Sequence, residues 1–484
     1  MPQLSGVVWG FASMLAQKIA YNTIISLISR VAGTIIALVN IGLITRYLGQ
    51  NGFGDYSTIL AFLYVFSVLA DLGLYSITLR EISKEGAPEK EIVSHAFSLR
   101  LWAGLFIFGL AALVVWLFPY SFEVKVGTGL AAFGFWLLSI NNVLIAVFQK
   151  YLRMEKVALA ELAGRAVQLG LSAFFIWKNL GFFNVILATS ISGVANFLLL
   201  FLFVRAYVPL TLTWNFAYWK RMLKQSYPLA ISAVFVMIYF KLDTVMLSLM
   251  KPSGDVGIYG VAYKILESLI FFPAVFVGLL MPLLSKYASA GIAEFKKIAQ
   301  RGLDFLIIFS VPLVAGGLAL SGRIINLIAG SEFAPAAGVL NILIFATAII
   351  FFGTLFSSMI IALEKQKALA KIYSIGALVN FGANLVLIPR FSYWGAASST
   401  LLTELLVTAF MLFVIKKAAS FFPNFRLAAK TIFSACLMAA VIFAASSLNL
   451  FLLLPIAFLV YFVALFALKG ISIQEALALV KRQD

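Results

Sequence analysis

Residues 182–205 read FFNVILATSISGVANFLLLFLFVR, and Arg205 is the only charged residue in this stretch. An α-helix rises about 1.5 Å per residue, so the stretch is long enough to cross the roughly 30 Å of hydrocarbon in a bilayer. It therefore predicts a transmembrane helix, and similar continuous apolar stretches recur along the chain. They predict about fourteen spans, at residues 20–45, 54–79, 93–118, 127–149, 157–177, 182–205, 228–250, 257–285, 302–321, 336–363, 367–388, 393–415, 427–447 and 449–468.

The composition indicates an all-α polytopic membrane protein. Of the 484 residues, 63% are hydrophobic and 11% are charged, and the mean hydropathy is +1.04. Soluble domains average about 45–50% apolar and about 25% charged residues, so a soluble enzyme or an ordinary DNA-binding protein is excluded. Cys436 is the only cysteine and His95 the only histidine. We therefore expect no intrachain disulfide, no metal site and no cofactor.

The Lys and Arg residues predict the orientation of the spans. With the N-terminus placed in the cytoplasm, 25 of the 36 fall in cytoplasmic segments and six in outer ones. Because cytoplasmic loops carry the excess of Lys and Arg, both termini are expected in the cytoplasm and the protein in the cell (cytoplasmic) membrane. Most of the net charge of +17 then reflects topology, and no nucleic-acid partner is needed. Residues 1–19 predict an interfacial segment, and residues 471–484 predict a surface helix in the cytoplasmic tail, 469–484.

Short sequence patterns predict two related halves. FGDY at residues 53–56 matches VGIY at 256–259, and MEK at 154–156 matches LEK at 363–365. The cytoplasmic amphipathic linker, 206–227, separates an N-lobe of six spans (20–205) from a C-lobe of six spans (228–417). The last two spans, within 426–468, lie outside the repeat. Six is an even number, so the halves form parallel repeats, and substrate is expected between them near mid-membrane.

Ten ionisable residues lie within the predicted spans. Such a group costs about 2.5–3.5 kcal/mol on insertion scales, so it normally faces protein or water. Three arginines lie about 8–11 residues from the cytoplasmic ends of their spans, or roughly 12–16 Å deep, and predict a cationic layer. Because guanidinium groups bind phosphate through paired hydrogen bonds, a phosphate-bearing ligand is favoured. The predicted substrate-binding cations are Arg30, Arg100, Arg165, Lys241 and Lys264, and the predicted coupling or cavity acids are Asp71, Asp243, Glu161, Glu267 and Glu404.

Several of these charges have an alternative structural role. Glu161 and Arg165 are spaced i,i+4, and Lys264 and Glu267 are spaced i,i+3, so each pair can neutralise itself. Arg30 and Arg100 have no local partner, which leaves an anion-facing cavity or a structural pairing with Asp71. Glu404 is equally consistent with a proton or cation site and with hydrogen-bonded packing.

Two regions of the sequence resemble Wzx-type oligosaccharide flippases of the polysaccharide transporter family. The first comprises TRYLG at 45–49, GFGDY at 52–56, LADLGL at 69–74 and REI at 80–82. The second comprises YFKLDTVML at 239–247 and VGIY at 256–259. These flippases share a superfamily with lipid II flippases and multidrug exporters. The resemblance therefore implies a V-shaped, MATE-like fold of two pseudo-symmetric six-helix lobes plus two C-terminal helices.

The resemblance also implies a function. A flippase of this family moves a polyprenyl-diphosphate-linked oligosaccharide to the outer leaflet by alternating access, for cell-surface polysaccharide biosynthesis. The interior cations would hold the diphosphate, and Ser29-Arg30 is similar to the cavity arginine region of lipid II flippases. No nucleotide-binding motif is present, so a sodium or proton gradient or the membrane potential is the expected driving force. The implied partners are the lipid-linked oligosaccharide, the bilayer and polysaccharide assembly proteins, and we expect a monomer.

Three other functions would make different demands on the sequence. A cation- or proton-coupled multidrug exporter of the same fold would need an acidic cavity, whereas five interior cations face five interior acids. A membrane-embedded enzyme would need a large outer loop or an acidic metal site, and the outer connections are short. Passive lipid scrambling is not distinguished from coupled transport by the sequence.

Overall fold

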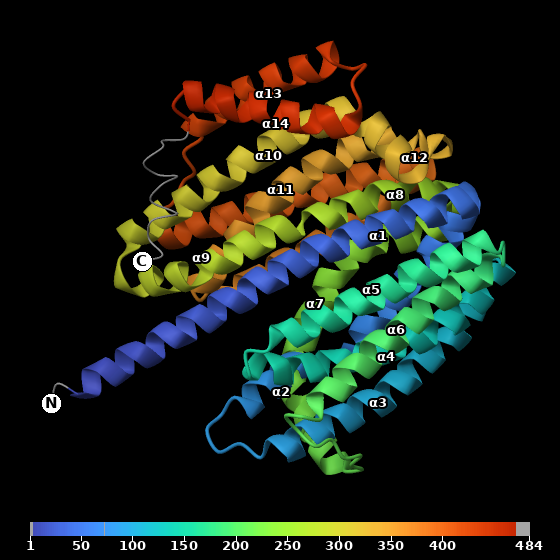
Figure 1. Ribbon diagram of the computed structural model, residues 1–484, viewed down its shortest axis with the longest axis vertical. Helices are drawn as coiled ribbons and strands as arrows, with labels where there is room; N and C mark the ends of the chain where they lie inside the picture. The colour runs from blue at the N-terminus through green and yellow to red at the C-terminus, as the bar shows by residue number, and fades with distance from the viewer. Residues whose placement is uncertain (1–2, 72, 471–484) are drawn as a thin grey trace. The chain divides into compact units, whose positions relative to one another are not determined.

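The computed structural model describes the backbone of residues 3–71 and 73–470, and the side chains of the same residues except 3–24 and 227–239. Every regular element within these residues is a helix, as the all-α prediction required (Figure 1). The chain divides into two compact units, Met1–Gly257 (unit 1) and Ile258–Asp484 (unit 2). The predicted surface helix at 471–484 lies outside the described residues.

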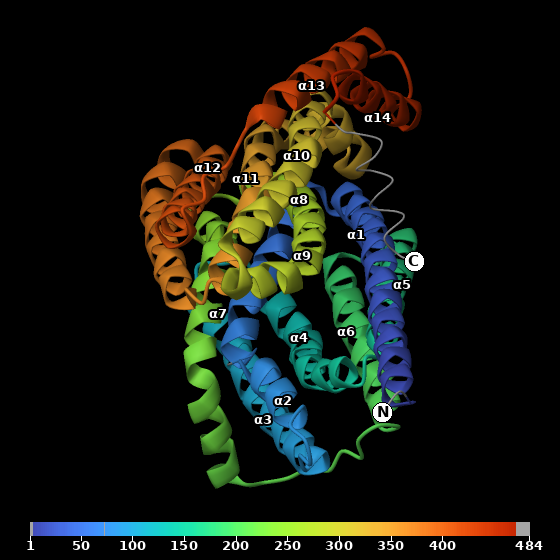
Figure 2. The same ribbon diagram turned by 90° about the vertical axis from the view of Figure 1, so that its left-hand side faces the viewer.

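Unit 1 packs its helices around a shared apolar core. α4 lies against α3 and α6, and α5 lies against α1 and α6. Val143 and Val147 of α4, Leu200 of α6 and Trp219 of α7 are all buried in this core. An extended segment connects α6 to α7 (Figure 2). The elements are α1 (Gln3–Asp71), α2 (Leu74–Ile82), α3 (Glu89–Val114), η1 (Val115–Leu117), α4 (Phe122–Lys150), α5 (Met154–Trp177), α6 (Phe182–Val204) and α7 (Phe216–Met250).

Unit 2 contains the remaining helices and most of α8, which begins just before the boundary between the units. α10 contacts α9, α11 and α13, and α14 packs on α13. Tyr461 of α14 donates a 2.8 Å hydrogen bond to the carbonyl of Ile308 in α10. The elements are α8 (Ser253–Leu269), α9 (Phe271–Ala290), α10 (Ile292–Ala329), η2 (Ser331–Phe333), α11 (Ala336–Ala362), α12 (Gln366–Ala419), α13 (Arg426–Ala444) and α14 (Leu450–Ala467).

The helices agree with the predicted spans. Within the described residues, eleven helical stretches are long and apolar enough to cross a bilayer. Two of them bend at a non-helical residue, Gly49 in α1 and Ser392 in α12, so each contains two predicted spans. The predicted span at 228–250 lies in α7. All fourteen predicted spans therefore fall on helices of the described chain.

Two predicted spans are interrupted where the backbone cannot continue a regular helix. The span at 54–79 breaks after Asp71, and Gly73 adopts a left-handed conformation (φ 70°) that starts α2. The span at 257–285 divides into α8 and α9 on either side of Ile270. Pro273 explains this second break, because proline lacks an N–H and its ring collides with the carbonyl four residues earlier, that of Leu269.

Candidate functional site

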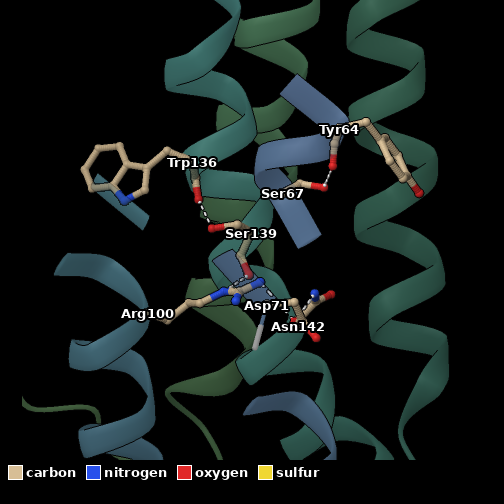
Figure 3. Close-up of polar contacts among 7 residues, drawn as sticks. All are labelled: Tyr64, Ser67, Asp71, Arg100, Trp136, Ser139 and Asn142. Atoms are coloured by element: carbon tan, nitrogen blue, oxygen red, sulfur yellow. Dashed lines mark hydrogen bonds and ion pairs between the residues drawn. The ribbon is translucent and has the colours of Figure 1, made fainter. Parts of the chain in front are cut away.

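Arg100 is buried in unit 1 and bonds to residues of two other helices. Its side chain is 1% exposed, and its Nη2 lies 3.0 Å from Oδ1 of Asp71 at the end of α1. Its Nε donates a 2.9 Å hydrogen bond to the carbonyl of Ser139 in α4. Asn142 of α4 donates to the same Asp71 oxygen at 2.9 Å (Figure 3). The structural alternative left open for Arg100 is therefore the geometry observed, and its burial does not support an anion-facing role.

Arg165 of α5 is held against α1 by a backbone hydrogen bond. Its Nη1 donates to the carbonyl of Gly33 at 2.8 Å. A Cβ at position 33 would lie 3.1 Å from Cδ of Arg165, so glycine permits this approach. Among the described contacts Arg165 bonds to Gly33 and not to Glu161, the partner that its spacing suggested. The guanidinium thus links two helices instead of neutralising an acid on its own helix.

Arg30 lies one helical turn before Gly33 on α1. Arg30 and Arg165 are both exposed in unit 1, and both lie on helices that are long and apolar enough to cross a bilayer. Exposed cations on membrane-spanning helices face water or a polar ligand. These two residues are therefore the members of the predicted cationic layer that a ligand can reach.

The charged residues of α7 differ in their surroundings. Lys241 Nζ lies 5.1 Å from the centre of the Tyr64 ring of α1, a cation–π distance. Asp243 is 1% exposed and therefore buried. Two residues along an α-helix are about 200° apart, so the two charges point to different sides of α7.

In unit 2, Lys264 and Glu267 form the ion pair that their spacing predicted. Lys264 Nζ lies 2.8 Å from Glu267 Oε2, and the side chains are 41% and 23% exposed. Both side chains are thus partly accessible to solvent, and their charges compensate each other. A structural role and a role in ligand binding are both consistent with this arrangement.

Glu404 of α12 is 5% exposed and follows Thr403 in a region of buried amides and hydroxyls. Asn380 Nδ2 lies 3.5 Å from Thr403 Oγ1, and Asn384 donates to Asn380 Oδ1 at 3.0 Å. Ser399 donates to the Asn380 carbonyl at 3.3 Å. Buried hydrogen bonds of this kind join the two segments of α12 on either side of Ser392.

The two halves repeat one tyrosine–threonine hydrogen bond. The Tyr56 hydroxyl of α1 lies 3.3 Å from Oγ1 of Thr189 in α6. The Tyr259 hydroxyl of α8 lies 3.3 Å from Oγ1 of Thr400 in α12. Both tyrosines end the matched patterns FGDY and VGIY, and the helices are the second and sixth spans of each half. The side-chain geometry therefore supports the internal repeat.

The turns that precede α5 and α12 also repeat, but in a different register from the sequence match. Leu152 and Glu364 both adopt positive φ, 52° and 57°. The amides of Arg153 and Lys365 then donate to carbonyls five residues earlier, at 2.8 and 2.9 Å. Lys365 therefore corresponds to Arg153, whereas the MEK and LEK patterns placed it opposite Lys156. A match of three residues is too short to align the two halves, whereas the backbone conformation of the turn determines their alignment.

The two motif glycines bring helices into backbone contact. A Cβ on Gly54 would collide with the carbonyl of Ser253 at the start of α8, and a Cβ on Gly257 would collide with the carbonyl of Gln50. Ser253 also donates a 2.6 Å hydrogen bond to Asp55 Oδ1. Only glycine permits such close approach, which explains why both copies of the pattern contain it.

One polar residue beside Arg165 was missed by the sequence reasoning. Gln168 lies one turn further along α5 and donates to Thr189 Oγ1 at 3.1 Å. Its Nε2 also lies 3.5 Å from the Tyr56 hydroxyl. Its i,i+3 spacing from Arg165 was the available signal, because such residues share a helix face. Within the described residues, no group of three His, Cys, Asp or Glu side chains could hold a metal ion.

A family model matches this chain over more than half its length. It is described as "Polysaccharide biosynthesis protein" and covers residues 19–288. The chain belongs to this polysaccharide biosynthesis protein family. A second model, MatE, matches residues 228–386. The resemblance to the superfamily of oligosaccharide flippases and MATE transporters is thereby confirmed.

The descriptions of related proteins agree with this family assignment. "Probable low-salt glycan biosynthesis flippase Agl15" of Haloferax volcanii is 22% identical over 80% of this chain and 81% of its own. "Probable flippase AglR" of the same organism is 28% identical over 43% of this chain, and the match spans 44% of that relative, less than half its length. The solved structure "Lipid II flippase MurJ, inward closed conformation" has a TM-score of 0.74 at 16% identity and covers 92% of this chain and 98% of its own. This likeness shows the shared fold.

Proposed function

We propose that this protein is a flippase that moves polyprenyl-diphosphate-linked oligosaccharide from the cytoplasmic to the outer leaflet of the cytoplasmic membrane by alternating access. Membership of the polysaccharide biosynthesis family supports this function, as do the flippase names of its relatives. The observation that carries it is the pair of exposed arginines, Arg30 of α1 and Arg165 of α5, because Arg165 bonds to Gly33, one helical turn after Arg30 on α1.

The physical reason is the charge of the substrate. A diphosphate cannot enter hydrocarbon without compensating charge, so its carrier must supply cations at membrane depth. One of the five N–H donors of Arg165 binds Gly33, which orients the planar group. The other donors suit the oxygens of a phosphate, and Arg30 supplies a second guanidinium at the neighbouring turn.

The other predicted site residues take supporting roles in this proposal. Lys241 and Lys264 are further cations for the phosphate or for acidic sugars. Arg100 and Asp71 position α1, α3 and α4 rather than touching substrate. Glu267 balances Lys264 on its own helix, and we assign Glu161 to the cavity acids near Arg165. We assign the buried acids Asp243 and Glu404 to coupling with a sodium ion or proton.

The orientation set by the Lys and Arg residues gives the transport a direction. With both termini in the cytoplasm, an inside-negative potential favours outward movement of an anion by about 2.3 kcal/mol per charge per 100 mV. A gradient of sodium ions or protons would add to this drive. We propose a monomer that acts beside the proteins that assemble the polysaccharide.

Gene deletion followed by complementation tests the proposal. Cells without this protein should accumulate lipid-linked oligosaccharide on the cytoplasmic side and lose surface polysaccharide. The native gene should restore both, whereas Arg30→Ala with Arg165→Ala should restore neither, and Arg165→Lys should restore part. Membrane levels of each variant, measured by immunoblot, control for expression. Full restoration by the double variant would refute the proposed site.

A multidrug exporter is the second candidate, because the MatE model matches residues 228–386. Exposed arginines favour an anionic substrate over the cationic drugs that an acidic cavity would bind. Expression in a drug-sensitive host separates the two functions. A raised tolerance of cationic drugs that survives Arg30→Ala and Arg165→Ala would favour the exporter.

A further inference from the structure

The segment that joins α6 to α7 has two chemically different faces. Residues 208–215 are extended, so successive side chains alternate between the faces. Thr211 and Thr213 face α3, where their backbone N–H groups donate to the hydroxyl oxygens of Ser94 and Ser98 at 3.1 and 2.9 Å. Thr213 Oγ1 also lies 2.9 Å from Nδ1 of His95. The polar face of this segment is thus fixed to a membrane-spanning helix.

The opposite face is apolar and exposed. Leu212, Trp214 and Phe216 alternate along the chain and are 67%, 63% and 65% exposed. Single exposed apolar residues are common in this chain, but the rings of Trp214 and Phe216 lie 5.4 Å apart and so form a contiguous aromatic surface. Exposed apolar side chains on a segment that hydrogen bonds hold in place indicate an apolar environment.

The position of Trp214 indicates which environment this is. Its ring lies 5.4 Å from that of Trp102, which is 41% exposed on α3. Trp102 follows Arg100 and lies at the start of the uncharged stretch 101–118, which is about 27 Å long and is therefore the part that spans the hydrocarbon. Tryptophan side chains gather where hydrocarbon meets headgroups. Trp214 therefore lies at the level of the membrane surface, next to lipid.

The charges beside the patch indicate the lipid class. Lys220, Arg221 and Lys224 are exposed on the first three turns of α7. An apolar face flanked by Lys and Arg is the arrangement found in segments that lie in the membrane interface and bind anionic lipids. We infer that residues 212–224 form a binding surface for anionic phospholipid headgroups in the leaflet that faces the cytoplasm.

Only the choice of leaflet rests on the proposed function and its orientation. Lipid contact would anchor the connection between the first six and the following spans at the membrane surface. The anionic lipid content of the leaflet would then set how firmly this connection is held. A soluble protein partner is the competing occupant, and the experiment below separates the two.

Site-specific fluorescence on the full chain tests this inference. Cys436, the only cysteine, is replaced by serine, and a polarity-sensitive fluorophore is attached at Trp214→Cys or, independently, at Phe216→Cys. Ser83→Cys, on the exposed turn between α2 and α3, is the water-exposed control. The protein is reconstituted in vesicles of phosphatidylcholine alone or mixed with phosphatidylglycerol, and quenching by iodide is compared with quenching by headgroup-labelled lipid.

The inference predicts iodide quenching about threefold weaker at positions 214 and 216 than at 83, because the headgroup region excludes the ion. The protection should be larger with phosphatidylglycerol, and should fall in high salt or with Lys220→Gln, Arg221→Gln and Lys224→Gln combined. Equal iodide quenching at all three positions would refute lipid contact and favour a protein partner. Equal protection in both vesicles would refute the choice of anionic headgroups. Neither readout depends on transport.

Discussion

Arg165 donates a 2.8 Å hydrogen bond to the carbonyl of Gly33 on a different helix, although Glu161 lies four residues away on its own. This contact turns the cation toward α1, where Arg30 lies one turn before Gly33. A small residue at position 33 is therefore a requirement of the proposed site. The first prediction concerns this glycine.

Gly33→Leu should displace Arg165 and lower transport about tenfold, because a lost charge-assisted hydrogen bond is worth about 1.5–3 kcal/mol. Gly33→Ala should retain most activity, since the exposed arginine need shift only slightly to admit a Cβ 3.1 Å from Cδ. Surface polysaccharide in complemented cells is the measurement. Gly170→Leu, where nothing lies within 4 Å of the added Cβ, is the matched control. Native activity in Gly33→Leu would contradict the role of the contact.

Asp71→Ala should destabilise the protein by about 3–5 kcal/mol, because it leaves the buried guanidinium of Arg100 uncompensated. Thermal unfolding in detergent measures the effect. Replacing both partners, by Asp71→Leu and Arg100→Met, should recover most of the loss. Arg30→Ala, at an exposed position, should change stability by about 0.5 kcal/mol or less. An unchanged melting temperature in Asp71→Ala would contradict the structural role.

Tyr56→Phe and Tyr259→Phe should each lower stability by about 0.5–1.5 kcal/mol, because each removes one hydrogen bond of the internal repeat. The same unfolding assay applies. Adding Thr189→Val to Tyr56→Phe should cost less than the sum of the separate changes, since both remove the same bond. Strict additivity would show that the two hydroxyls do not interact.

Gly54→Ala should weaken the packing of α1 against α8 by about 1–3 kcal/mol, because its Cβ would meet the backbone carbonyl of Ser253. The amount of folded protein extracted from membranes should fall with it. Gly129→Ala in α4 has open space around the new Cβ, and there alanine should stabilise the helix slightly. Equal behaviour of the two variants would mean that the close approach is not required.

The sequence predicted the helices well because the information is local. An apolar stretch of sufficient length specifies a span wherever it lies, and Lys and Arg mark the loops between spans. The breaks at Gly73 and Ile270 have equally local causes, a left-handed glycine and Pro273. They were missed because the apolar pattern continues through both positions.

The contacts of the charged residues were less predictable, because most of them join helices far apart in the chain. Spacing identified the Lys264–Glu267 pair correctly. It also suggested Glu161 for Arg165, but the carbonyl of Gly33 on α1 takes that place. Pairing of Arg100 with Asp71 was one of two options, and only the packing of α1, α3 and α4 decides between them.

The repeated tyrosine–threonine bond has a consequence for the history of the chain. Two halves that share a bond and a turn are what duplication and fusion of one ancestral gene would leave behind. An ancestor of six spans returns to the side on which it began, so both copies could insert the same way without any reversal. The two copies differ at the proposed site. When the halves are aligned on their shared turns, the residue that corresponds to Arg165 is Ala377, which is buried. Under the proposed function, the arginine that binds phosphate therefore belongs to the first copy alone.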